Sequence, residues 1–220
     1  MKAIVVREFG PPNVMRLEEV DDPRPGPGEV VVRVHAVSVN RTLDTVARAG
    51  KFKRRVTLPV VLGVDPSGVI VEVGPGVTSR KVGDRVVTST RVRSESAADG
   101  PQLLSVHAWG GYAEYFKTRA EGTTIVPDGV GLSTANVIAR HAPTAFHLLR
   151  DRAKLKQGEW VLVMGAAGGL GSAGVQAAKY LGAKVIAAAG ADERVKAGLD
   201  LGADAGVNYR QTFGGGTGFG

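Results

Sequence analysis

The sequence has no cysteine among its 220 residues, so disulfide bridges and thiolate metal sites are excluded. This composition is consistent with a cytoplasmic protein. No apolar run approaches the ~20 residues that span a bilayer, so no membrane partner is expected. The first residues, MKAIVVREFG, lack a long apolar stretch and a cleavage site, and they predict a first β-strand in place of a signal peptide.

Aromatic residues are also few, with 2 Trp, 4 Tyr and 6 Phe, and this matters for interpreting the net charge of +7. A basic protein can bind nucleic acid or other anions. Here the basic residues are scattered, apart from Lys51, Lys53, Arg54 and Arg55, and they do not alternate with aromatic residues. The pattern favours a solvated basic surface and a small-molecule ligand over nucleic acid.

Residues 1–125 predict a β domain. Short valine-rich segments alternate with Pro/Gly turns such as 21–28 (DDPRPGPG), at intervals typical of a sandwich or barrel. A short helix is expected from Arg41 to Ala49, ended by Gly50. The segment 90–106 is polar and unpatterned, so it predicts an exposed loop.

The strongest pattern is residues 160–188, WVLVMGAAGGLGSAGVQAAKYLGAKVIAA, which predict a strand, a glycine-rich turn, a helix and a second strand. The nearly all-apolar run Trp160–Met164 predicts a parallel strand covered on both faces. The turn fits G-x-G-x-x-G as Ala166-x-Gly168-x-x-Gly171. Such glycines let the backbone approach a diphosphate, to which the following helix offers free N–H groups and its positive dipole end. An ordinary tight turn in a βαβ unit is the alternative.

A helix over 192–201 and a strand over 205–209 follow, which together predict half of a doubly wound α/β domain. An earlier helical segment contains Pro143, which is expected to break or kink it. We therefore expect a β domain over 1–125, a partial nucleotide-binding domain with a connecting helix over 126–212, and a glycine-rich tail over 213–220. The tail, FGGGTGFG, predicts disorder or an abrupt truncation.

In combination these motifs resemble the medium-chain dehydrogenase/reductase superfamily, and within it the zinc-independent quinone oxidoreductase-like branch. The matching stretches cover nearly the whole chain and are residues 1–10, 28–40, 63–76, 83–86, 110–115 and 165–209. The resemblance implies an α/β fold, with a GroES-like β domain followed by a partial Rossmann doubly wound parallel sheet. It also implies an NAD(P)-dependent oxidoreductase with its active site in the cleft between the two domains.

Zinc-dependent members of the superfamily place a Cys, a His and a second Cys in that cleft. The corresponding positions here are Asn40, Val64 and Arg140, which supply neither thiolate nor imidazole. The four histidines have no spacing typical of a metal site and are interpreted as surface or packing residues: His35, His107, His141 and His147. The sequence therefore predicts no metal.

The resemblance also implies site residues. Asn40 matches an active-site asparagine that orients a substrate oxygen, and Thr42 matches a hydroxyl that handles protons in zinc relatives, with an N-cap-like role as its alternative. Arg41 matches an arginine near the cofactor phosphates, with a surface arginine as the alternative. Thr144 matches a threonine beside the nicotinamide. The remaining cofactor-binding positions belong to the glycine turn and are Ala166, Gly168, Gly169, Leu170 and Gly171.

Charge at the end of the second Rossmann strand distinguishes the two pyridine nucleotides, because NAD-specific domains place a carboxylate there. In this sequence residues 187–190 read AAAG. The resemblance gives Arg194 the position of a lysine that binds the 2′-phosphate, and Tyr209 that of a tyrosine near the adenosine. Asp192 and Glu193 complicate this interpretation, although acids in a first turn are ordinary partners of the helix dipole. We predict NADPH, with NAD as the alternative.

Relatives continue beyond the third Rossmann strand, so we expect a C-terminally truncated chain with an uncovered sheet edge. In many relatives that further segment carries the dimer edge, so a homodimer is expected only where it is present. The leading functional hypothesis is NADPH-dependent hydride transfer to a quinone, enone or carbonyl substrate without zinc. The alternatives are an alcohol dehydrogenase-like protein that has lost its metal, and a catalytically inactive nucleotide-binding protein with a structural or RNA-associating role.

Overall fold

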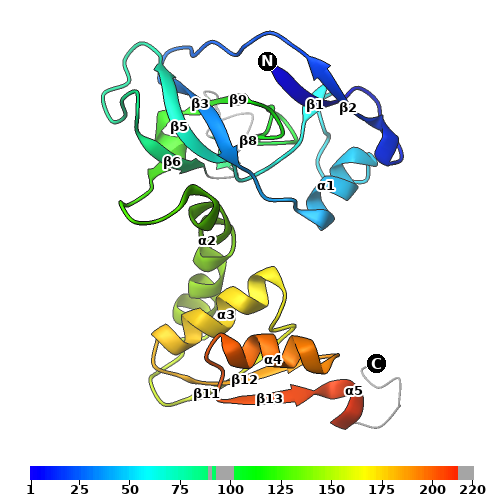
Figure 1. The fold of residues 1–220 in the computed structure, drawn as a ribbon, viewed down its shortest axis with the longest axis vertical. Helices are drawn as coiled ribbons and strands as arrows, with labels where there is room; N and C mark the ends of the chain where they lie inside the picture. The colour runs from blue at the N-terminus through cyan, green and yellow to red at the C-terminus, as the bar shows by residue number, and fades with distance from the viewer. Residues whose placement is uncertain (89–90, 93–101, 213–220) are drawn as a thin grey trace. The chain divides into compact units, whose positions relative to one another are not determined.

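The computed structural model describes residues 1–88, 91–92 and 102–212 (Figure 1). The predictions for the tail 213–220 and for the middle of the 90–106 segment lie outside these residues. The chain divides into two compact units, unit 1 (Met1–Ala139) and unit 2 (Arg140–Gly220). The expected α/β class, a β domain followed by a parallel sheet with helices, is confirmed. In the described part of the chain, no helix is both long enough and apolar enough to cross a bilayer.

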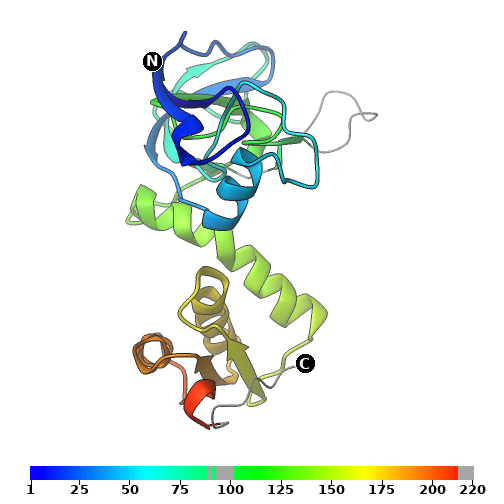
Figure 2. The same ribbon diagram turned by 90° about the vertical axis from the view of Figure 1, so that its right-hand side faces the viewer.

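The described part of unit 1 contains three antiparallel sheets and the helix α1 (Arg41–Arg48) (Figures 1 and 2). The five-stranded sheet has the order β10-β6-β5-β3-β9 and the second sheet the order β2-β1-β4, while β7 pairs with β8. The strand bounds are β1 Lys2–Val6, β2 Met15–Glu19, β3 Glu29–Ala36, β4 Val60–Val61, β5 Ser67–Val73, β6 Arg85–Thr88, β7 Arg91–Val92, β8 Gln102–Leu103, β9 Tyr115–Arg119 and β10 Thr123–Ile125. Two short 3-10 turns, Pro12–Val14 and Ala120–Gly122, connect them.

The core of unit 1 forms around β3. Val30 and Val32 are fully buried and pack with Ile70, Leu104 and Phe116. The expectation of an exposed loop over 90–106 is wrong at its end, because Leu104 and Val106 have no exposed surface. Side chains from β3 and β9 surround Leu104, and Val106 packs in a separate cluster with Val6 and Val60; the local sequence does not reveal these contacts.

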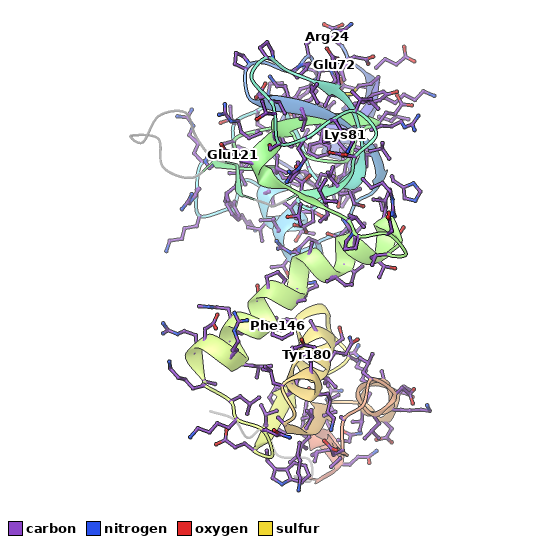
Figure 3. The ribbon with its side chains drawn as sticks, turned by 90° about the vertical axis from the view of Figure 1, so that its left-hand side faces the viewer. Arg24, Glu72, Lys81, Glu121, Phe146 and Tyr180 are labelled. Carbon is purple, nitrogen blue, oxygen red and sulfur yellow. The ribbon has the colours of Figure 1, made fainter. Side chains whose placement is uncertain are left out.

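Helix α2 (Leu132–Phe146) runs through Pro143 and continues as a π-helix over His147–Arg152. Of the expected break or kink at Pro143, the break is wrong and the kink stays a prediction, since the ring removes one backbone donor from the helix. The last turn of α2 packs against α3 (Gly169–Tyr180), and Figure 3 shows Phe146 and Tyr180 close together. Their ring centroids are 5.6 Å apart and the planes meet at 83°, an edge-to-face contact.

Unit 2 contains the predicted strand, glycine turn, helix and strand. Its parallel sheet has the order β11-β12-β13, with bounds Trp160–Met164, Lys184–Ala189 and Ala205–Asn208. Helix α4 (Asp192–Asp200) connects β12 to β13, and the short α5 (Tyr209–Thr212) follows. Figure 1 shows α3 and α4 on the same side of this sheet, where Val175, Val185 and Ala187 form the core.

The opposite face of this sheet is exposed at β11. Trp160, Leu162 and Met164 are 55%, 56% and 55% exposed, and the Lys184 Nζ lies 5.5 Å from the centroid of the Trp160 ring. The expectation that both faces of this strand are covered is therefore wrong for the described residues. The physical reason is that α3 and α4 cover only the side to which Val161 and Val163 point.

Candidate dinucleotide site

A cavity of about 380 Å³ lies at the carboxyl ends of the three parallel strands. In open α/β sheets this edge is where ligands bind, because the connecting loops leave a crevice there. The glycine turn after β11, the end of β12, the first turn of α4 and the residue after β13 all contribute. The lining residues are Gly165, Ala167, Gly168, Ala189, Gly190, Arg194 and Tyr209. The structure thus brings together three predicted positions: Gly168, Arg194 and Tyr209.

The glycine turn presents the amino end of α3 to this cavity. Gly168 is the N-cap and Gly169 the first helical residue, and no side chain caps the helix. Its first turn contains no acidic residue, so no carboxylate offsets the positive dipole end and the unpaired N–H groups of that turn. A β-carbon on Gly171 would lie 2.1 Å from the Gly165 carbonyl oxygen, so this position admits only glycine. The turn has the chemistry of a diphosphate-binding site.

Ala166, which replaces the first glycine of the motif, is fully buried in the core of unit 2. Its N–H donates to the Ala188 carbonyl at 3.2 Å, which ties the turn to the end of β12. Leu170 is 42% exposed on the first turn of α3. Ala166 therefore anchors the turn to the core of unit 2, while Gly168 lines the cavity.

The far end of the cavity is basic and aromatic. A β-carbon on Gly190 would lie 2.8 Å from Tyr209 Oη and 3.2 Å from Arg210 Nε, so both side chains reach the strand end because position 190 is glycine. Among the described residues that line the cavity there is no carboxylate. Sequence reasoning missed Arg210, although a second basic residue directly after Tyr209 was a readable signal.

Asp192 complicated the prediction of NADPH from the sequence. It is not among the residues that line the cavity. Its Oδ1 accepts a hydrogen bond from Asn208 Nδ2 at 2.6 Å, and its Oδ2 accepts one from Gln211 Nε2 at 3.1 Å. Both carboxylate oxygens are thus directed at the residues around α5.

In unit 1, Asn40 is held by a partly buried polar network. It is the N-cap of α1, and its Oδ1 accepts the Leu43 N–H at 3.0 Å, which leaves Nδ2 as its donor group. The Asn40 N–H donates to Asp44 Oδ2 at 2.8 Å, and the Tyr112 hydroxyl donates to the same oxygen at 2.6 Å. Burial, and then the hydrogen bond to Asp44, raise the pKa of Tyr112, so it remains a donor.

Three further predicted site residues, Arg41, Thr42 and Thr144, are divided between the two units. Arg41 begins α1, but its side chain is outside the described part of the structure. Thr42 is exposed on the first turn of α1, and an N-cap role for it is wrong because Asn40 takes that position. Thr144 is exposed on α2 in unit 2.

His141 is a further side chain at the glycine turn of unit 2. A β-carbon on Gly169 would lie 2.5 Å from His141 Nε2, so the imidazole lies against the first residue of α3. The sequence interpretation as a surface or packing histidine could not include this contact, because α2 and α3 are separated by the whole of β11.

The described residues contain no ready set of zinc ligands. In the described ranges, no three His, Cys, Asp or Glu side chains lie close enough to hold a metal, and the sequence has no cysteine. Val64, at a position where zinc members carry a histidine, is fully buried and apolar.

Comparisons with known proteins agree with this arrangement. Residues 26–128 match the alcohol dehydrogenase GroES-like domain, and residues 169–215 match the zinc-binding dehydrogenase family. An alcohol dehydrogenase of Geobacillus stearothermophilus is 36% identical over 94% of this chain and 64% of its own length. The human quinone oxidoreductase is 35% identical over 96% of this chain and 59% of its own length. The chain belongs to the medium-chain dehydrogenase/reductase superfamily.

Solved structures of this superfamily superpose on the chain. The quinone oxidoreductase of Escherichia coli in complex with NADPH has a TM-score of 0.80 at 30% identity, covering 96% of this chain and 59% of that one. A NAD-dependent alcohol dehydrogenase has a TM-score of 0.87 at 36% identity, covering 95% of this chain and 64% of that one. This member of the superfamily thus spans about 60% of the length of the relatives that it matches.

Proposed function

We propose that this chain is an NADPH-dependent oxidoreductase that transfers hydride to a quinone, enone or carbonyl compound without zinc. The observation that carries the proposal is the cavity of unit 2, where Gly168, Arg194 and Tyr209 lie together at the carboxyl edge of a parallel sheet. Both kinds of relative, quinone oxidoreductases and alcohol dehydrogenases, support pyridine-nucleotide chemistry.

The two ends of the cavity would bind different parts of the cofactor. The N–H groups of Gly169, Leu170 and Gly171 would bind the cofactor diphosphate, since the amino end of α3 has neither a side-chain cap nor an acid in its first turn. The Gly168 N–H does not take part, because it donates to the Gly165 carbonyl at 2.8 Å. Arg194 would pair with the 2′-phosphate, and Tyr209 would pack beside the adenosine. Because no carboxylate lines the described cavity, the extra charge of NADPH meets attraction there.

Bound NADPH supplies the hydride, and the protein contributes substrate orientation and a proton. The Asn40 Nδ2 group is the donor that would hold the substrate oxygen, because its Oδ1 is engaged by the Leu43 N–H. The exposed Thr42 hydroxyl would pass a proton to that oxygen as it gains charge. Arg41 and Thr144 would assist in holding the cofactor. In a reaction without zinc, charge on the oxygen would be stabilised by hydrogen bonds.

The proposal is tested by calorimetric titration of the full chain with NADPH and with NADH, followed by NADPH oxidation with a panel of quinones and enones. Arg194→Ala is expected to weaken NADPH binding by about tenfold or more and to change NADH binding by less than about twofold. Lys196→Ala is the matched control, because it removes a positive charge from the same helix that is paired with Asp200 at 2.7 Å. Absence of binding heat with both nucleotides contradicts the proposal.

Oxidation of simple alcohols with NADP⁺ is the second candidate function. It is favoured by the relatives, since the alcohol dehydrogenase and the quinone oxidoreductase are 36% and 35% identical to this chain. Formation of NADPH from NADP⁺ and simple alcohols, compared with NADPH oxidation by quinones and enones, distinguishes the two directions of hydride transfer.

A further inference from the structure

We infer that Asp192 is a positioning residue that sets the preference for NADPH by fastening α5 to α4, an inference that rests on the proposed function. An acid at this point of a Rossmann domain suggests NAD, because a carboxylate can accept the ribose 2′-hydroxyl. The structure assigns the Asp192 carboxylate a different task, since both oxygens accept hydrogen bonds from side chains that flank Tyr209.

Hydrogen bonds among Asp192, Asn208 and Gln211 hold the two sides of Tyr209; we call this set of contacts the latch. Asn208 Nδ2 donates to Asp192 Oδ1 at 2.6 Å, while Asn208 Oδ1 accepts the Arg210 N–H at 3.1 Å. Gln211 Nε2 donates to Asp192 Oδ2 at 3.1 Å. Tyr209 is therefore fixed from both sides, by the residue before it and by the second residue after it. Figure 2 shows the short α5, in red, beside α4, in orange.

The latch matters because α5 spans only Tyr209–Thr212. A helix of four residues makes almost no internal hydrogen bonds and is not stable by itself. Its position must come from outside contacts, and the Asp192 carboxylate supplies two charge-assisted ones. Without them, Tyr209 and Arg210 lose the constraint that holds them against Gly190 at the end of the cavity. Tyr209 would serve both nucleotides, so the selectivity would come from the Arg210 cation, which only a 2′-phosphate would attract.

The test measures the ratio of the NADPH and NADH dissociation constants in the full chain. Asp192→Ala is expected to weaken NADPH binding about tenfold and to change NADH binding by less than about threefold. Asp192→Asn keeps one acceptor for Asn208 Nδ2, so it is expected to restore part of the selectivity. Gln211→Ala breaks only the second contact and should have a smaller effect of the same sign.

Glu193→Ala is the matched control, because it removes the same charge from the same first turn of α4. Its effect on helix stability through the dipole should equal that of Asp192→Ala, so thermal unfolding of the two variants separates stability from selectivity. The control is expected to leave the selectivity ratio within about twofold of the parent protein.

Three outcomes overturn the inference. Tighter NADPH binding by Asp192→Ala would mean that the carboxylate merely repels the 2′-phosphate. Weaker NADH binding alone would mean that it holds the ribose hydroxyls. An unchanged ratio would mean that α5 needs no latch. If the parent protein binds neither nucleotide, the proposed function fails first, so the two failures are distinguishable.

Discussion

The two units bury apolar strands in different ways. In unit 1, three successive valines of β3, Val30–Val32, are at most 3% exposed, so both faces of that strand are covered. In unit 2, the equally apolar β11 exposes Trp160, Leu162 and Met164 on one face. A continuous apolar run therefore indicates that a strand can be buried on both faces. Whether both faces are buried depends on which other segments pack against them.

The difference between the units also separates two kinds of site. In unit 1 the polar residues around Asn40 are side chains inside a partly buried network, in which Asp44 is only 7% exposed. In unit 2 the site consists mainly of backbone at an open sheet edge, with Arg194 and Tyr209 at one end. In the proposed function, unit 1 would therefore orient a small group and unit 2 would bind an extended anion.

The largest expected effect tests the contrast in burial. Phe116→Ala in β9 removes a side chain that is 2% exposed and packs in the core of unit 1, and it should lower the free energy of unfolding by about 3–5 kcal/mol. Phe9→Ala, at 46% exposure, is the control and should cost about 1 kcal/mol or less. Chemical denaturation measures both. Equal losses would show that exposure does not distinguish these positions.

The second prediction concerns the backbone of unit 2. Gly171→Ala places a methyl group 2.1 Å from the Gly165 carbonyl oxygen, so the turn must move; stability should fall by about 2–3 kcal/mol, together with NADPH affinity. Gly174→Ala in the same helix is the matched control, because its new methyl group would lie 3.6 Å from Val163 Cγ1, an ordinary contact. It should be neutral or stabilising by up to about 1 kcal/mol. Wild-type nucleotide binding by Gly171→Ala would contradict the role of the turn.

Local rules predicted the backbone site of unit 2 well. The strand, glycine turn, helix and strand were readable from apolar spacing and glycine positions. Asn40 as the N-cap of α1 was readable too, since Asn is among the best capping residues, whereas the sequence prediction gave an N-cap-like role to Thr42.

Contacts between distant segments were not readable. The burial of Leu104 depends on β3 and β9, which are far away in the sequence. The bonds from Asp192 to Asn208 and Gln211 exist only because parallel strands bring α4 beside the end of β13. The exposed face of β11 reflects which segments pack on it, which no property of the strand itself determines.

The third prediction tests the exposed face of β11. Leu162→Gln should change the free energy of unfolding by about 0.5 kcal/mol or less, because Leu162 is 56% exposed, and it should lower the fluorescence of an apolar-surface dye. Val163→Gln, one residue along on the covered face, should cost about 1–3 kcal/mol because it places an amide in the core of unit 2. Similar losses for the two variants would contradict the assignment of the two faces.

The smallest expected effect is a pH dependence specific to unit 2. The Lys179 ammonium, and then the Val185 N–H, hold the pKa of Asp204 below its ordinary value. Because this pKa is lower in the folded state, the contact stabilises unit 2 above the unfolded pKa and is lost as pH falls through the folded one. Asp204→Asn should therefore reduce the fall in the free energy of unfolding at acid pH, which we call the acid limb and which is measured by denaturation at several pH values. Asp200→Asn, which breaks the exposed pair with Lys196, is the control and should leave that limb unchanged, since an exposed pair without a backbone donor contributes little. If both variants shift the limb equally, the tie between α3 and β12 has no special role.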